Sequence, residues 1–323
     1  MLPLSILDLV PQASDQTSST AIAASVALAQ HAEALGYHRI WYAEHHSLPG
    51  IASTAPDLMI AHVGARTSHI RLGAGGVMLP NHASLRIAEA YRLLASMYPN
   101  RIDLGLGRAP GTDGPTALAL RGPAQVHRDD FPEQLAELEH WAEAHSGVVA
   151  QPDDTPLPPI WLLGSSDYSA RLAAIRGYPF AYAAHFSPAP PEPMMLGYRQ
   201  AFRAGRTPEP RAMLAVAAFV AETHEEAVDL ARPALVAFVR LRTGRVAKPP
   251  TREEARRVHF TPVEAAVAAQ VEATRFVGTP DAVASKIRAV AERCRADEVI
   301  VTTHMSDVAA RLASAELLMR AWR

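Results

Sequence analysis

Residues 36–46 read GYHRIWYAEHH, and this stretch decides the fold prediction. A helix ends at its glycine, a strand is expected over 38–43, and the tripeptide Glu44-His45-His46 follows that strand. Residues 101–111, RIDLGLGRAPG, repeat the order, with a short strand followed by glycines and Arg108. In barrels of alternating strands and helices, polar residues at the carboxyl ends of the strands face the active-site mouth. Two such strand ends in one chain predict an enzyme.

Short apolar runs alternate with longer amphipathic runs along almost the whole chain. Strands are expected at residues 4–9, 38–43, 70–75, 102–106, 160–163, 180–184, 213–221 and 298–302. Helices are expected at residues 20–35, 55–67, 84–97, 131–145, 168–176, 192–204 and 225–243, after a strong start at Thr279-Pro280-Asp281, and at the end. Eight strand–helix units predict a closed (β/α)8 TIM barrel, with residues 1–323 forming one domain. An open doubly wound sheet is the alternative.

Two long segments interrupt this alternation. Residues 109–130, after the fourth strand, are rich in Gly, Pro and Thr and are predicted to form a long loop. Residues 244–274, after the seventh strand, are basic and contain prolines, so they are predicted to be an irregular insertion. Loops of this length in compact domains are usually functional or disordered. We expect both segments to contribute to the walls of a substrate pocket.

Composition excludes several classes of protein. The formal net charge is −2 and hydrophobic residues make up 49%, which favours a large core and argues against a nucleic-acid or membrane partner. Cys294 is the only cysteine, so an intramolecular disulfide and a cysteine-based metal site are excluded. No signal peptide and no membrane span is evident, so a cytoplasmic location is expected.

The tripeptide Glu44-His45-His46 has three interpretations. It could hold a metal, but successive strand residues point to opposite faces, and no His-Glu-x-x-His helix is present. One histidine could instead satisfy a buried carbonyl. The position at a strand end favours an acid–base or flavin-contacting histidine. No metal is expected.

Glycine-rich strand ends offer further candidates. The run at residues 105–111 differs from a dinucleotide fingerprint in spacing and contains a proline, so Arg108 is either a surface ion-pair partner or a bidentate phosphate ligand. Ser165 and Ser166 open a helix, where they could cap it or bind a phosphate together with its free amides.

Gly75 and Gly76 end the third strand, where glycines permit either tight packing or the close approach of a planar ring. His185 and His304 end two later strands, and each alone is weak evidence.

Taken in order, these motifs resemble the bacterial luciferase-like flavin monooxygenase family. The resemblance covers nearly the whole chain, and it looks closest to the single-chain alkanal-monooxygenase-like branch. It rests on Glu44-His45-His46 and on the stretches VMLP at 77–80, NRIDLGLGRAPG at 100–111, PIWLLGSS at 159–166 and VGTP at 277–280. It implies a (β/α)8 barrel that binds FMN at its mouth.

The resemblance also implies roles for particular residues. His45 matches the catalytic histidine of luciferase, with Glu44 and His46 supporting it. Arg108 matches a phosphate-binding arginine, and Ser165, Ser166 and Ser169 match further contacts, although luciferase has an acid at the position of Ser165. Gly75–Gly76 matches a non-proline cis peptide under the flavin ring. His185 is included among the cofactor-binding candidates.

The implied reaction has two components. A separate flavin reductase supplies reduced FMN, which reacts with O₂ to oxidise a small organic substrate such as an aldehyde. The chain is expected to pair with itself through its second and third helices. A deazaflavin- or NAD(P)H-dependent hydride transfer on the same barrel is one alternative, and a non-catalytic flavin-binding protein is another. The intact Glu44-His45-His46 and Arg108 argue against the non-catalytic one.

Overall fold

The structure is a computed structural model, and it describes residues 1–109, 111–123, 130–144, 147–187 and 189–323. Among these residues, eight parallel strands form a closed barrel, because β10 pairs with β1 on one side and with β8 on the other. The barrel strands are β1 (Leu4–Asp8), β2 (Arg39–Tyr42), β3 (Arg71–Ala74), β5 (Ile102–Gly107), β6 (Ile160–Gly164), β7 (Phe180–Ala183), β8 (Ala212–Val220) and β10 (Glu298–Thr302). The predicted TIM barrel is confirmed, and the open sheet is wrong.

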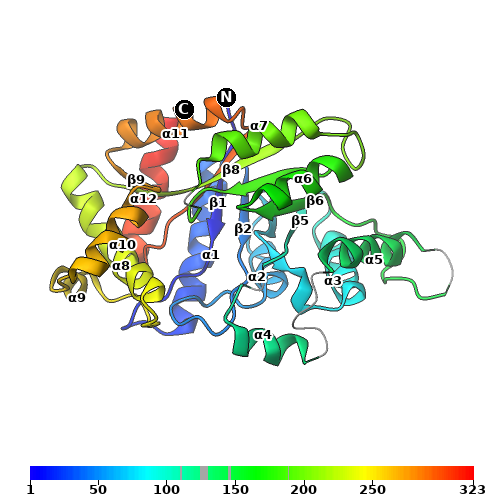
Figure 1. Cartoon of the computed structure of the whole chain (residues 1–323), viewed down its shortest axis with the longest axis horizontal. Helices are drawn as coiled ribbons and strands as arrows, with labels where there is room; N and C mark the ends of the chain where they lie inside the picture. Colours follow the sequence, from blue (N-terminus) through cyan, green and yellow to red (C-terminus); the bar gives the residue numbers. More distant parts are fainter. Residues whose placement is uncertain (110, 124–129, 145–146, 188) are drawn as a thin grey trace.

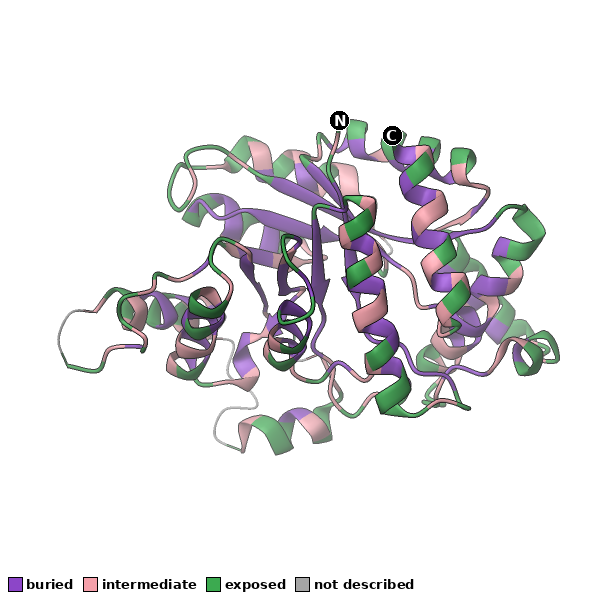
Figure 2. Cartoon of the chain, turned by 180° about the vertical axis from the view of Figure 1, so that it is seen from behind, coloured by how far each residue is buried: buried purple, intermediate pink, exposed green. Residues whose placement is uncertain are grey.

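Helices surround the strands (Figure 1). They are α1 (Ser18–Leu35), α2 (Pro56–Gly64), α3 (Ser84–Met97), α5 (Phe131–Glu143), α6 (Asp167–Arg176), α7 (Pro191–Ala201), α8 (His224–Arg242), α11 (Pro280–Arg293) and α12 (Val308–Trp322). Figure 2 shows the strands buried and the helices buried only on the side facing them. The strands are buried on both faces, so their sequences are continuous apolar runs. The helices are buried on one face, so their sequences are amphipathic.

Two short strands lie outside the barrel ring. After β3, strand β4 (Val77–Met78) pairs with the end of β5, and a single turn η1 (Leu79–Asn81) follows. Strand β9 (Arg275–Gly278) pairs with the second half of β8, at residues 217–220. β8 is therefore long enough to close the barrel with its first half and to hold β9 with its second.

Both predicted irregular segments contain helices. The described part of 109–130 holds α4 (Gly114–Arg121), which Asp113 caps by accepting a hydrogen bond from the Thr116 amide. Segment 244–274 holds α9 (Arg252–Arg256) and α10 (Pro262–Glu272), so the irregular insertion was a wrong prediction. Both of the latter helices start with a capping box, which satisfies amides that would otherwise lack partners. The predicted helix end at His145 lies outside the described residues.

A network of buried charges fills the lower part of the barrel. The Arg39 guanidinium lies 2.6 Å from Asp103 and 2.8 Å from Glu298, and Arg71 also bonds to Asp103. Arg39 is 5.2 Å from the centre of the Trp161 ring. Since every charge here has an opposite partner, the network is fully paired, and it lies deeper in the barrel than the mouth.

Candidate active site

A cavity of about 300 Å³ opens at the carboxyl ends of the barrel strands. Its floor is apolar, with Leu7, Trp41 and Ile300 from three different strands. The predicted residues that line it are His45, Gly75, Gly76, Arg108, Ser165, Ser166, Ser169 and His185. The structure therefore brings eight of the ten predicted site residues into one cavity, and only Glu44 and His46 lie elsewhere.

His45 follows strand β2 and is held from two sides. Its backbone amide donates to the carbonyl of Ser53 at 3.1 Å, and its Nδ1 lies 3.1 Å from the carbonyl oxygen of Gly111. A carbonyl can only accept, so Nδ1 carries the proton and Nε2 of the neutral ring is an acceptor. Burial lowers the pKa of His45, although the Gly111 carbonyl and Glu44 favour the charged form. The ring is therefore neutral at pH 7, with an unprotonated Nε2.

Glu44 and His46 face away from this cavity, as expected for alternate positions. One oxygen of the buried Glu44 carboxylate lies 2.7 Å from His46 Nε2 and 2.8 Å from His82 Nε2, and the other accepts from the Met78 amide. Burial alone would raise the pKa of Glu44, but the bonds from His82, His46 and Met78 lower it. His82 was missed because it lies 38 residues away in sequence.

These three side chains could hold a metal, since their ligand atoms all lie within 4.8 Å of one another. Two ligands of a tetrahedral zinc would lie about 3.3 Å apart, given metal–ligand distances of about 2.0–2.1 Å. The separations of 2.7 and 2.8 Å are instead those of charge-assisted hydrogen bonds. The cluster is best described as a carboxylate held between two imidazoles.

Arg108 and the serines meet at one end of the cavity. The Arg108 guanidinium lies 4.4 Å from the centre of the Tyr168 ring, in the first turn of α6. Ser166 is the N-cap residue of α6 but makes no capping bond with its side chain, and its Oγ lies 3.4 Å from that of Ser169. Hydroxyls, free helix amides and a guanidinium thus line the same end, which is the donor set that phosphates bind.

Gly75 and Gly76 are joined by a cis peptide bond, as predicted. A Cβ on Gly75 would lie 2.6 Å from Leu7, and one on Gly76 would lie 2.9 Å from the Gly105 carbonyl oxygen. Both glycines also line the cavity with their backbone. The two interpretations of these glycines are therefore compatible. Tight packing leaves no space for a side chain at either position, and their backbone forms part of the cavity wall.

A second cavity of about 340 Å³ adjoins the first. His45, His185 and Phe186 line both, and the second is otherwise mostly apolar, with one wall formed by α8. His304, at the end of β10, lines only the second cavity. Burial lowers the pKa of His185 to about 4 and that of His304 to about 3, so both are neutral at pH 7. The sequence marks His304 as a histidine at a strand end and assigns it no role.

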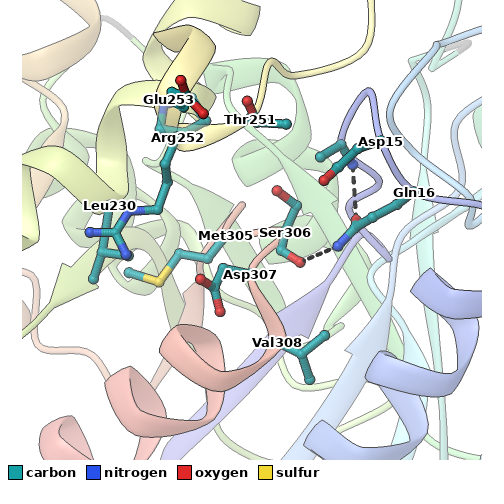
Figure 3. Close-up of a pocket in the computed structure, with 12 residues that line it drawn as sticks. Asp15, Gln16, Leu230, Thr251, Arg252, Glu253, Met305, Ser306, Asp307 and Val308 are labelled. Atoms are coloured by element: carbon teal, nitrogen blue, oxygen red, sulfur yellow. Dashed lines mark hydrogen bonds between the residues drawn. The ribbon is translucent and has the colours of Figure 1, made fainter. Parts of the chain in front are cut away.

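A further hollow of about 540 Å³ lies elsewhere at the rim (Figure 3). Gln16 donates to the Ser306 carbonyl at 2.7 Å, and Figure 3 shows this bond. Arg252 is paired with Asp229 at 2.6 Å. The hydrogen bond connects two loops, and the ion pair connects helix α8 to helix α9. The hollow contains none of the predicted site residues.

The sequence matches a known protein family over most of its length. The model of luciferase-like monooxygenases matches residues 2–297. The chain belongs to the luciferase-like monooxygenase family. A luciferase-like monooxygenase of Escherichia coli K12 is 39% identical over 325 residues, covering 98% of this chain and 96% of the relative. Family membership places the protein among flavin-dependent monooxygenases.

Two further proteins are similar over nearly their whole length. The N-acetyl-S-alkylcysteine monooxygenase of Bacillus subtilis is 33% identical over 328 residues, covering 98% of this chain and 97% of the relative. The crystal structure of apo-MsnO8 superposes with a TM-score of 0.92 at 34% identity, covering 100% of this chain and 98% of that one. Among the described residues of this luciferase-like monooxygenase, no helix has the length and apolar character needed to cross a membrane.

Proposed function

We propose that this chain is the oxygenase component of a two-component monooxygenase, which takes reduced FMN from a separate flavin reductase and oxidises a small organic substrate with O₂. The observation that carries the proposal is the pair of adjoining cavities with His45 lining both. One cavity would take the flavin and the other the substrate. The imidazole of His45, whose tautomer is fixed by the Gly111 carbonyl, lines both.

The residues of the first cavity fit FMN. Arg108, Ser166 and Ser169 with the amides of α6 would hold its phosphate, and the apolar floor with the Gly75–Gly76 backbone would face its ring. Bound reduced flavin supplies the reducing equivalents that activate O₂. His45 would accept or return a proton through Nε2 at the junction with the second cavity. The surrounding apolar side chains would exclude water from the same place.

Other solved proteins with this fold use different cofactors. A type II Baeyer–Villiger monooxygenase solved with FMN superposes with a TM-score of 0.74 at 20% identity, and an F420-dependent secondary alcohol dehydrogenase with 0.72 at 14%. At these identities the similarity shows the fold alone. A relative from Acinetobacter baylyi, 29% identical over 167 residues, is named the oxygenase component of a flavin-dependent trigonelline monooxygenase, and this name supports a separate reductase.

The test compares cofactors and oxygen chemistry in one protein. We expect the chain to quench FMN fluorescence on binding and to bind F420 more weakly. Mixing the chain with prereduced FMN and then O₂ should delay release of hydrogen peroxide relative to free reduced FMN. NADH alone should not reduce the bound FMN, because the reductase is separate. Tight F420 binding without FMN binding would replace the proposal by deazaflavin-dependent hydride transfer.

We also propose that the chain acts as one domain and forms a homodimer through α2 and α3, in the cytoplasm. Leu58 on α2 is 68% exposed, and Leu93 and Met97 on α3 are 49% and 52% exposed. Neighbouring exposed apolar side chains on two helices are typical of an interface. Light scattering should give twice the monomer mass, and Leu58→Glu with Leu93→Glu should give the monomer mass.

A further inference from the structure

The ring of Tyr168 lies beside the end of the first cavity that carries the phosphate-type donors. Tyr168 is the second residue of helix α6, two positions after the N-cap residue Ser166. The guanidinium carbon of Arg108 stands over this ring, 4.4 Å from its centre. The next shortest contact of this kind in the described part of the chain measures 5.0 Å, between Arg288 and Trp322. Since a cation within roughly 6 Å of a ring face is attracted to it, Arg108 and Tyr168 form a close cation–π pair.

This pair joins two neighbouring strand ends. Strands β5 and β6 lie side by side, with Gly107 in register with Leu163. Arg108 follows β5 directly, and Tyr168 lies in the helix that follows β6. Arg108 lines the first cavity, whereas Tyr168 is not one of its lining residues. The contact therefore ties the long arginine side chain of one strand end to the start of the next helix, from outside the cavity.

The start of α6 offers further donors to an anion. The first amides of a helix have no partner within it, and the N-cap residue Ser166 makes no capping bond with its side chain. The amide of Tyr168 is one of these first amides. The carboxylate of Asp167, which would repel a phosphate, pairs at 2.7 Å with Arg171, and both of these side chains are exposed. The negative charge in the first turn of α6 is therefore compensated.

A contact that holds Arg108 in place favours anion binding. A long side chain loses rotamer entropy when it binds a ligand, and one that is already held in position loses less. Tyr168 is 39% exposed, so without its ring the guanidinium would lie near the surface with water as its surroundings. A guanidinium over a ring can still donate to a phosphate, because it carries five N–H donors in its plane. The contact with Tyr168 can thus fix Arg108 without replacing a hydrogen bond to an anion.

We propose that Tyr168 is a positioning residue for the flavin phosphate, and that its ring holds the Arg108 guanidinium at the N-terminus of α6 before FMN binds. This inference rests on the proposed function, since it deepens how the first cavity binds FMN. Because the Tyr168 side chain acts through Arg108, it contributes to the affinity for the phosphate and not to that for the flavin ring. The phenol hydroxyl has no part in this role, so phenylalanine should replace tyrosine.

The test measures the dissociation constants of FMN and riboflavin by fluorescence quenching. Tyr168→Leu should weaken FMN binding by about twofold to fivefold, the equivalent of about 0.5–1 kcal/mol for a partly exposed cation–π contact, and should leave riboflavin binding unchanged. Tyr168→Phe should leave both constants unchanged, because it keeps the ring. Ile175→Ala, which alters an exposed apolar side chain at the other end of α6, is the control and should change neither.

A double-mutant cycle shows whether Tyr168 acts through Arg108. In the Arg108→Ala background, Tyr168→Leu should cause no further loss of FMN affinity, because the cation that the ring holds is gone. A loss that persists in this background would overturn the inference, since the ring would then act independently of Arg108. An equal loss for FMN and riboflavin in Tyr168→Leu would also overturn it, because general damage to the cavity would explain both.

Two further outcomes separate this inference from the proposed function. If the unaltered protein binds FMN and Tyr168→Leu binds it equally well, only the role of Tyr168 is wrong. The same conclusion follows if Tyr168→Phe loses as much FMN affinity as Tyr168→Leu, because the hydroxyl would then matter and the ring would not. If the unaltered protein binds neither FMN nor riboflavin, the proposed function fails and the role of Tyr168 fails with it.

Discussion

Gly111 lies so close to Glu44 that a Cβ atom on Gly111 would stand 3.0 Å from the Glu44 carbonyl oxygen. Its φ of +64° is also a conformation that other residues adopt at a cost of about 1–2 kcal/mol. This glycine carries the carbonyl that fixes the tautomer of His45. The backbone of the loop after β5 therefore sets the protonation pattern of the imidazole after β2.

Gly111→Ala should consequently impair catalysis without removing a catalytic group. The loop must shift, so the carbonyl moves away from His45, and displacements of this kind cost about tenfold to a hundredfold in rate. The measurement is single-turnover substrate oxidation with prereduced FMN. Gly114→Ala is the control, because a Cβ there meets nothing within 4 Å. Equal rates in the two variants would show that Gly111 does not orient His45.

His45→Ala should lower turnover by about 10²–10⁴-fold, the usual contribution of general acid–base catalysis, while FMN affinity stays intact. His46→Ala should cost less, because its ring bonds to Glu44 outside the cavity. Single-turnover oxidation with prereduced FMN measures both. Near-normal oxidation by His45→Ala would leave this histidine with a structural role.

Arg108→Ala should weaken FMN binding by about tenfold to a hundredfold, since a charge-assisted contact is worth roughly 1.5–3 kcal/mol. Riboflavin, which lacks the phosphate, should bind almost as before. Fluorescence quenching gives both dissociation constants. Arg171→Ala on the exposed side of α6, where Arg171 pairs with Asp167, is the control. An equal loss for FMN and riboflavin would show that Arg108 does not bind the phosphate.

Arg39→Met should destabilise the fold by about 3–5 kcal/mol, because it leaves Asp103 and Glu298 buried with fewer partners. Urea unfolding measures the free energy. Arg320→Met, which removes an exposed pair with Glu316, should change it by less than about 0.5 kcal/mol. A similar loss of unfolding free energy in the two variants would contradict the description of Arg39, Asp103 and Glu298 as a buried network of paired charges.

Acidification should destabilise the protein through its neutral histidines. The pKa values of about 4 for His185 and about 3 for His304 lie below the ordinary value of 6.5, so between pH 6.5 and 4 the unfolded chain binds protons that the native state does not. The free energy of unfolding should fall by at most about 1.4 kcal/mol per pH unit for each histidine, since the cavities admit some solvent. The variant His185→Gln with His304→Gln should show a shallower fall in urea unfolding between pH 7 and 5. Identical slopes would mean that the two rings are protonated in the native state.

The sequence contained enough to predict the barrel and most of the site. Polar residues after β2, β5 and β6 meet because parallel strands bring their carboxyl ends to one edge, so His45, Arg108 and Ser166 could be grouped from order alone. The cis bond at Gly75–Gly76 came from the resemblance and not from the residues. Thr251 and Thr261 each precede a glutamate at the third position, a helix-start signal that was present but overlooked.

Other features had no local signal. His82 joins Glu44 only through the path of the chain after β3, and Arg275 meets α8 only because β9 pairs with the far end of β8. Nothing in a single sequence distinguishes an arginine at an exposed position from one that packs against a helix, as Arg275 does. Side-chain partners that depend on tertiary packing therefore required the structure.

The two halves of strand β8 have different neighbours. Its first half belongs to the ring that holds the first cavity, while its second half anchors β9 and the polypeptide leading to it. Val246, Ala247, Pro249 and the inner side of α8 border the second cavity but not the first. Mutational libraries restricted to those positions should yield altered substrate ranges in proteins that keep their flavin. Exchange of this one peripheral segment should therefore change the substrate specificity while the barrel stays unchanged.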